Sequence, residues 1–190
     1  MGKYFGTDGI RGVANDTLTT EIAYKVGRFL GHYCKKNGKA KVCIGKDTRI
    51  SSSMFESILA GGLASSGCNA YLIGYCSTPC LAYVAENDGF DLGIMISASH
   101  NPYQDNGIKV FSNTGVKISE ELELQVEDYI DNKITIESYP SSMHSPTIPP
   151  IPELPLTSDS LTRQLIILEP LTWPTMPPQP INPITVELSA

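Results

Sequence analysis

The sequence predicts an α/β fold: a layered α/β/α domain with a mostly parallel mixed β-sheet, followed by a Pro-rich irregular C-terminal tail. Two observations lead to this prediction. Over residues 1–137, short apolar segments typical of buried strands alternate with amphipathic segments of helical period. Near residue 138 the composition changes, because all 16 glycines precede this point and twelve of the 14 prolines follow it. We therefore expect one domain over residues 1–137 and a disordered tail over residues 138–190.

The first two helices are expected directly before and directly after the first predicted strand in the sequence. Apolar side chains recur at helical spacing until Gly38 ends the pattern, and Thr19 or Thr20 is placed to cap the helix. A second amphipathic segment starts at Met54 and is stopped at Gly67. Both segments have the apolar stripe that lets a helix pack on a sheet.

Two more helices are expected further along the chain. Pro79 is suited to the first turn of a helix that runs towards Glu86. Ser119 is placed to cap the last helix, with Glu120 favourably positioned near its N-terminus and apolar residues on one face as far as Ile130.

The strands are predicted from short apolar runs at residues 41–44, 70–73, 92–96 and 108–111. Helices separate the first three, which favours parallel pairing. Only a short loop joins the last two, so that pair can add an antiparallel element. Residues 46–53 are expected to form a polar loop.

The polar residues that follow the third strand form the strongest site candidate. Residues 97–101 carry two hydroxyls, an imidazole and an amide, and ligands of open α/β sheets gather at the carboxyl ends of strands. Pro102 disfavours the helical region for Asn101, and Asn106-Gly107 is predicted to form a turn. For each residue taken singly, the favoured interpretation is that it caps backbone groups in a solvated turn.

The ordered set of motifs resembles the α-D-phosphohexomutase family. Ser-Ala-Ser-His-Asn-Pro at 97–102, followed by Asp-Asn-Gly-Ile-Lys at 105–109, resembles the active-site serine loop of that family. Residues 4–12 resemble the opening motif of its phosphoglucosamine mutase branch. Residues 45–51, Gly-Lys-Asp-Thr-Arg-Ile-Ser, and Thr78-Pro79 resemble two further motifs. The resemblance covers about residues 3–137, which correspond to the first of the four family domains.

The resemblance implies that Ser99 is phosphorylated and donates its phosphoryl group to a hexose phosphate, whereas Ser97 has no carrier role. A phosphoserine adds charge and three acceptor oxygens that a cation can bind. The resemblance also implies Mg²⁺ on the Ser99 phosphate, held together with three aspartates of an Asp-Gly-Asp-Gly-Asp loop in a second domain. Residues 112–190 contain no match to that loop.

The same resemblance gives four other residues a role. His100 and Asn101 would orient the phosphoserine. Arg11 and Lys109, by their positions in the matched motifs, would bind the transferring phosphate or move protons at the sugar hydroxyl. The adjacent Ser99 and His100 do not suggest a serine hydrolase, because neighbours on an extended segment point in opposite directions and no Gly-x-Ser-x-Gly elbow is present.

Structural roles remain open for some charged residues. Arg11 could brace the opening loop by an ion pair with Asp8, and Lys109 could be a solvated strand residue. Asp47 and Arg49 are interpreted as structural, holding the loop before the second helix.

The net charge of −6 and the pI near 5.0 argue against a nucleic-acid partner. No signal peptide or apolar run of membrane length is recognisable, so we expect a soluble cytoplasmic protein without a membrane partner. The five cysteines are odd in number and suit buried thiols better than a disulfide framework. Cys76 and Cys80 lack the second pair of a zinc site.

The leading functional hypothesis is a phosphohexomutase domain that carries the active-site phosphoserine. Its expected partner is a hexose or hexosamine phosphate, and in the full-length family the reaction would interconvert glucosamine 6-phosphate and glucosamine 1-phosphate. The choice of glucosamine over glucose or mannose phosphates rests only on the motif at residues 5–12. The alternative is a truncated, non-catalytic fragment that folds and can self-associate, for example as a homodimer, without turnover. Whether the tail is a linker or the product of a shifted reading frame is left open by the sequence.

Overall fold

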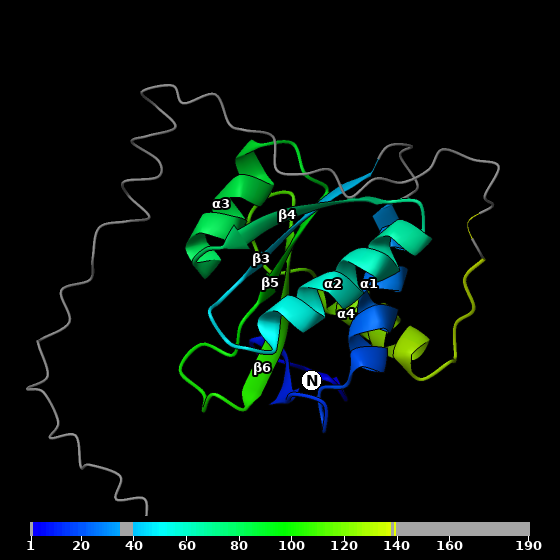
Figure 1. Ribbon diagram of the computed structural model, residues 1–190. Coiled ribbons are helices and arrows are strands. Elements are labelled where there is room, and N and C mark those ends of the chain that lie inside the picture. The colour runs from blue at the N-terminus through cyan, green and yellow to red at the C-terminus, as the bar shows by residue number, and fades with distance from the viewer. Residues whose placement is uncertain (1, 35–39, 138, 140–190) are drawn as a thin grey trace, which may run out of the picture.

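The computed structural model describes residues 2–34, 40–137 and 139 (Figure 1). Its sheet, within these residues, has six strands in the order β1-β2-β6-β5-β3-β4. The strands are β1 (Phe5–Gly6), β2 (Gly9–Val13), β3 (Lys41–Lys46), β4 (Asn69–Tyr75), β5 (Leu92–Ile96) and β6 (Asp105–Ser112). The predicted tail over residues 138–190 lies outside the described residues, except for Tyr139.

The strand pairing confirms a mixed sheet. Strand β3 pairs in parallel with β4 on one side and β5 on the other. Strands β5 and β6 pair antiparallel, as their short connection predicts, and β2 and β1 continue the antiparallel pattern. Strands β2, β3, β4 and β5 therefore point the same way, and their carboxyl ends lie at one edge of the sheet.

The four predicted helices are all present in the described residues. They are α1 (Thr20–Cys34), α2 (Ser52–Ser65), α3 (Thr78–Asn87) and α4 (Glu120–Ile130). Thr19 caps α1 by accepting the N–H of Ile22 at 3.2 Å, and Ser119 caps α4 by accepting the N–H of Leu122 at 3.3 Å. The predicted end of the first helix at Gly38 lies outside the described residues. In the described ranges, no helix has the length and apolar character needed to cross a membrane.

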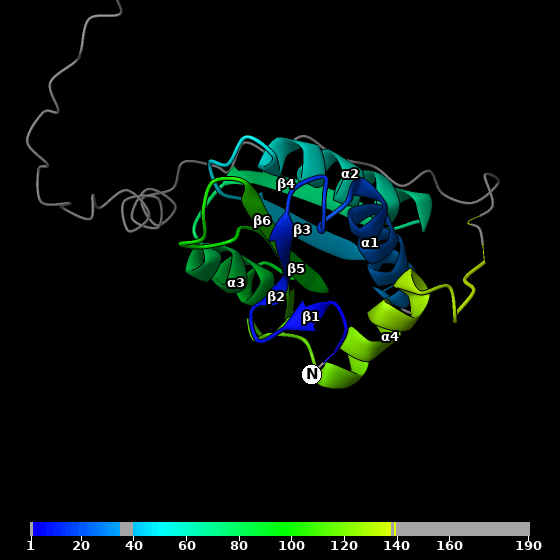
Figure 2. The same cartoon turned by 90° about the horizontal axis from the view of Figure 1, so that it is seen from below.

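The helices cover both faces of the sheet and confirm the α/β/α layers (Figures 1 and 2). The larger core joins α1, α2 and α4 to one face, where Val42 and Ile44 are buried. Cys43 and Met95 point to the opposite face and pack with Leu81 of α3. This alternation is the one expected of strands buried on both sides.

Helices α1 and α2 approach each other closely because glycines face the contact. A Cβ atom on Gly27 would lie 2.5 Å from the carbonyl oxygen of Leu59. A Cβ atom on Gly62 would lie 2.7 Å from the carbonyl oxygen of Tyr24. Both positions therefore exclude larger side chains, and the helix pair forms one layer over the sheet.

The opening segment forms a short hairpin that the sequence analysis did not predict. Strands β1 and β2 pair across Phe5 and Ile10. A buried carboxylate on α4, that of Glu127, accepts the backbone N–H groups of Lys3, Tyr4 and Phe5 at 2.7–2.8 Å. These charge-assisted bonds anchor the N-terminal segment to the last helix.

The predicted turn at Asn106-Gly107 is wrong, because both residues lie inside β6. Asn106 is fully buried, and its side-chain amide donates to the hydroxyls of Ser51 and Ser52 at 2.8 and 3.1 Å. A Cβ atom on Gly107 would lie 2.6 Å from the carbonyl oxygen of Ser97. Tertiary hydrogen bonds and a close backbone approach therefore explain why this dipeptide, which elsewhere favours turns, lies inside a strand.

Candidate active site

The serine loop, defined as residues 97–104, connects β5 to β6 at the carboxyl edge of the sheet. A second segment from the same edge lies beside it, since the backbone N–H of Asp47 donates to the carbonyl oxygen of Ile96 at 3.0 Å. The segments that follow β3 and β5 are therefore joined where the loop begins. This is the location expected for a ligand site in an open α/β sheet.

Ser99 has an unusual backbone conformation. Its φ angle is 56°, in the left-handed region that residues with a Cβ atom rarely adopt. The backbone N–H of Ser99 donates to the Oγ of Ser97 at 2.9 Å. Ser97 is buried, whereas Ser99 and His100 are exposed. The buried serine thus supports the exposed one, a role that the sequence analysis did not assign to Ser97.

Arg49 holds the serine loop from the opposite side. Its Nε donates to Asp47 Oδ2 at 3.0 Å, and its side chain is only 10% exposed. Its two terminal nitrogens donate to the carbonyl oxygens of Ser99, Asn101, Pro102 and Asp105 at 2.5–3.0 Å. The structural role expected for Asp47 and Arg49 thus extends to a loop that lies about 50 residues away in the chain.

The strand register places Arg11 and Lys109 on one face of the sheet. Arg11 pairs with Gly107, and the N–H of Ser97 donates to the carbonyl oxygen of Gly107 at 2.9 Å. Lys109 follows Gly107 by two residues and pairs with Met95, so its side chain projects to the same face. The register therefore places Lys109 on β6, which leads out of the serine loop, and Arg11 on β2, the next strand of the sheet.

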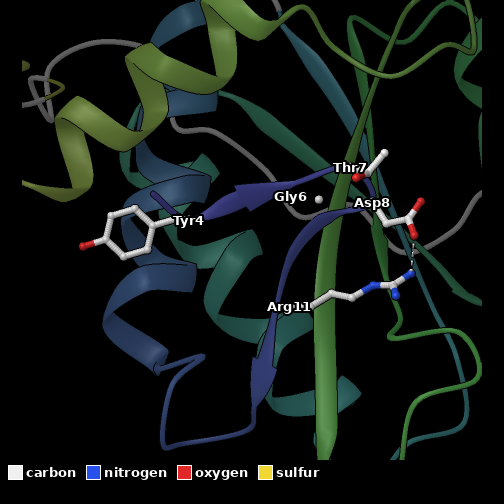
Figure 3. A pocket seen from close by; sticks show the side chains of 6 residues that line it. Tyr4, Gly6, Thr7, Asp8 and Arg11 are labelled. Carbon is white, nitrogen blue, oxygen red and sulfur yellow. Dashed lines mark hydrogen bonds and ion pairs between the residues drawn. The ribbon is translucent and has the colours of Figure 1, made fainter. Parts of the chain in front are cut away.

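Arg11 also forms an ion pair with Asp8, which is the alternative, structural role considered for it from the sequence. Its Nη2 lies 3.1 Å from Asp8 Oδ2, and Figure 3 shows the two side chains pointing toward each other. Among the described residues, the buried Nε of Arg11 has no hydrogen-bond partner. Arg11 lines an open hollow of about 290 Å³ with Thr7 and Asp8, while Tyr4 points away from them (Figure 3). The guanidinium has further N–H groups beyond the one that pairs with Asp8, and the side chain is 23% exposed beside the hollow.

The amide of Asn101 braces the loop. Its Nδ2 donates to Asp105 Oδ2 at 2.9 Å, and its backbone N–H donates to the carbonyl oxygen of Ala98 at 3.1 Å. His100, the other predicted orienting residue, is exposed beside Ser99. The structure thus places both residues in the loop that presents Ser99.

The described cysteines are free thiols. Burial raises the pKa of Cys43 and Cys68 to about 12. At the start of α3, a hydrogen bond from Cys76 instead lowers the pKa of Cys80 to about 7. In residues 2–34 and 40–137, no group of three or more His, Cys, Asp or Glu side chains is arranged to hold a metal ion.

Taken together, the geometry presents an exposed hydroxyl on a braced loop, with two cations on adjacent strands. Serine oxygen is a weak nucleophile unless a partner removes its proton, but a serine phosphate needs mainly cations and positioning to transfer its phosphoryl group. The arrangement therefore suits a phosphoryl carrier better than a hydrolytic nucleophile.

Known proteins match this part of the chain. Residues 2–137 match the sequence profile of phosphoglucomutase/phosphomannomutase, alpha/beta/alpha domain I. The phosphoglucosamine mutase of Lachnoclostridium phytofermentans is 63% identical over 134 residues, which cover 70% of this chain and 30% of that protein. That of Lachnospira eligens is 58% identical over 137 residues, covering 70% and 30%.

A solved structure shows the same fold. A phosphoglucomutase/phosphomannomutase family protein from Burkholderia thailandensis superposes with a TM-score of 0.60 at 26% identity, covering 71% of this chain and 31% of its own. The chain thus spans about 30% of the length of the curated relatives. Through residues 2–137, which match its α/β/α domain I, the chain belongs to the phosphoglucomutase/phosphomannomutase family.

Proposed function

We propose that Ser99 is the phosphoryl carrier of a phosphohexomutase that interconverts glucosamine 6-phosphate and glucosamine 1-phosphate. The observation that carries this proposal is the exposed Ser99, held in a left-handed conformation at the carboxyl edge of the sheet. The choice of an amino sugar is supported by the phosphoglucosamine mutases among the relatives.

The proposed reaction has two phosphoryl transfers. In the first, a sugar hydroxyl attacks the phosphorus of phosphorylated Ser99, the bond from phosphorus to Ser99 Oγ breaks, and a sugar bisphosphate forms. The sugar bisphosphate then reorients in the site, and its other phosphoryl group is transferred back to Ser99 Oγ. Each transfer moves one proton from the attacking hydroxyl to a base, and the leaving oxygen receives one.

Four residues would support these transfers. Arg11, whose guanidinium has N–H groups beyond the one paired with Asp8, would bind the phosphate as it moves. Lys109, from the neighbouring strand, would neutralise charge or move the proton at the sugar hydroxyl. His100 and Asn101 would keep the phosphoserine oriented, Asn101 through its bond to Asp105.

A Mg²⁺ ion is proposed to bind the Ser99 phosphate and neutralise its charge. Since the described residues provide no cluster of metal-ligating side chains, its other ligands would come from outside them. Activity of the isolated 190-residue chain is therefore not part of the proposal.

A complementation assay tests the proposal. The chain is mixed with the part of the Lachnospira eligens relative that lies beyond its first domain, and conversion of glucosamine 6-phosphate is measured with Mg²⁺ and a sugar bisphosphate present. We expect background turnover from either part alone and weak turnover from the mixture, because assembling a site from separate chains must overcome association entropy. Ser99→Ala should abolish turnover. Turnover that survives Ser99→Ala would contradict the carrier role.

A further inference from the structure

We propose that Arg49 is the positioning residue of the serine loop and fixes the backbone of Ser99 in the conformation from which phosphoryl transfer occurs. This inference rests on the proposed carrier role of Ser99. It goes beyond bracing the segment before α2, because it links Arg49 to the chemistry of a serine in another part of the chain.

The hydrogen bonds of Arg49 use its entire donor capacity. A guanidinium carries five N–H groups. One donates to the Asp47 carboxylate, and the other four donate to the carbonyl oxygens of Ser99, Asn101, Pro102 and Asp105. No N–H is left for a sugar phosphate, and the side chain is 10% exposed. Arg49 therefore acts through the loop, in contrast to Arg11.

The guanidinium is itself fixed by rigid neighbours. Asp47 Oδ1 accepts the backbone N–H of Arg49 at 3.1 Å and the hydroxyl of Ser52 at 2.8 Å. The backbone N–H of Asp47 donates to Ile96 at the end of β5. We call Arg49 and its four bonds to the loop carbonyls the clamp. The clamp is thus anchored both to the start of α2 and to the strand that leads into the loop.

The clamp counteracts a backbone preference. The left-handed conformation of Ser99 persists only where surrounding contacts impose it. Arg49 binds the carbonyl oxygen of Ser99 itself, and Ser97 binds the N–H of the same residue. Both peptide groups that flank the Cα atom of Ser99 are therefore held. Lysine cannot replace Arg49, since it is a point charge with three donors and no planar fork.

The test compares Arg49→Lys and Arg49→Ala with Arg28→Lys. Arg28 is a matched control, because its guanidinium also donates to backbone carbonyls, those of Ser65 and Glu137, at a site other than the serine loop. Amide hydrogen exchange of residues 97–105 reports the clamp. The rate at which glucosamine 1,6-bisphosphate phosphorylates Ser99 reports its chemical consequence. This rate is followed by mass spectrometry over a concentration series, with Mg²⁺ and the part of the Lachnospira eligens relative that lies beyond its first domain present.

We expect Arg49→Lys to speed exchange in the serine loop and to lower the maximal phosphorylation rate, each by about tenfold, with the half-saturating bisphosphate concentration changed less than about twofold. Millimolar guanidinium should partly restore the maximal phosphorylation rate of Arg49→Ala. The rate of a variant that is merely destabilised would not be raised by guanidinium, since millimolar concentrations barely change stability. Arg28→Lys should match the wild type in both measurements.

Three results would overturn the proposal: unchanged loop exchange in Arg49→Lys, a wild-type phosphorylation rate in that variant, or a defect confined to the half-saturating concentration. A phosphorylation rate of Arg49→Ala that guanidinium does not raise would also count against it. If the wild-type mixture converts glucosamine 6-phosphate but Ser99 takes up no phosphate, the carrier role of Ser99 fails, and loop exchange alone then decides whether Arg49 holds the loop.

Discussion

The Oγ of Ser97 accepts the backbone N–H of Ser99 at 2.9 Å, so the two serines of the loop have different tasks. Ser97 is 6% exposed and points inward, whereas Ser99 is exposed. A buried hydroxyl that holds the N–H of a left-handed residue stabilises a strained backbone. The inner serine therefore supports the backbone of Ser99, the proposed carrier.

Replacing Ser97 should weaken the loop without removing the carrier. We expect Ser97→Ala to lose about 1 kcal/mol of unfolding free energy, because the N–H of Ser99 loses its partner. Phosphorylation of Ser99 should slow but remain on Ser99. Ser57→Ala is the matched control, since Ser57 donates to a backbone carbonyl within α2. Chemical denaturation and phosphorylation kinetics measure both effects, and a Ser97→Ala protein indistinguishable from the control would contradict this role.

Arg11 should matter for phosphate binding more than for stability. Its ion pair with Asp8 is partly exposed, with side-chain exposures of 23% and 60%, so Asp8→Asn should change the unfolding free energy by less than about 1 kcal/mol. Arg11→Gln should raise the half-saturating bisphosphate concentration for Ser99 phosphorylation by about tenfold or more. Equal half-saturating concentrations in Arg11→Gln and the wild type would show that Arg11 only braces the hairpin.

Glu127 should be a major determinant of stability. Its carboxylate accepts three backbone N–H groups at the start of the chain. Glu127→Ala leaves these donors unsatisfied and should reduce the unfolding free energy by about 3 kcal/mol. Glu121→Gln, at an exposed position on the same helix, should have little effect. Denaturant unfolding of both variants measures the difference, and similar losses in the two would refute the anchoring role.

Cys80 should be the reactive thiol of the described domain near neutral pH. The hydrogen bond from Cys76 lowers the pKa of Cys80 from the ordinary 9.0 to about 7. Alkylation of Cys80 should therefore be slow below pH 7, and above pH 7 it should approach the rate of the fully ionised thiolate. Burial raises the pKa of Cys34, Cys43 and Cys68, which should stay protonated and unreactive.

Alkylation rates mapped by peptide mass spectrometry across pH test this assignment. In Cys76→Ala the Cys80 profile should move to higher pH, because the hydrogen bond that stabilises the thiolate is gone. A midpoint near pH 9 in the wild type, or no shift in Cys76→Ala, would contradict the assignment.

The sequence could predict the elements whose signals are local. The caps at Thr19 and Ser119 are present, since a side chain three residues before a free N–H is enough to form them. The antiparallel pairing of β5 and β6 followed from the short connection between them. Hydrophobic alternation likewise located the buried strands.

Other features depend on contacts that sequence spacing does not reveal. Strand β1 has two residues and is held by Glu127, more than 120 positions away, so no local period marks it. Lys46 belongs to β3 and forms a buried ion pair with Glu56, although a polar loop was expected to begin there. The acceptors of Arg49 are backbone carbonyls, which every residue has, so no side-chain pattern could identify them.

Peptide mapping tests the central claim most directly, because it asks which side chain receives the phosphoryl group. The chain is mapped after incubation with glucosamine 1,6-bisphosphate, Mg²⁺ and the part of the Lachnospira eligens relative that lies beyond its first domain. We predict a single phosphate on Ser99 of the wild type, none on Ser99→Ala, and a phosphate still on Ser99 in Ser97→Ala. Phosphate on Ser97, or uptake that persists in Ser99→Ala, would contradict the assignment of Ser99 as the carrier.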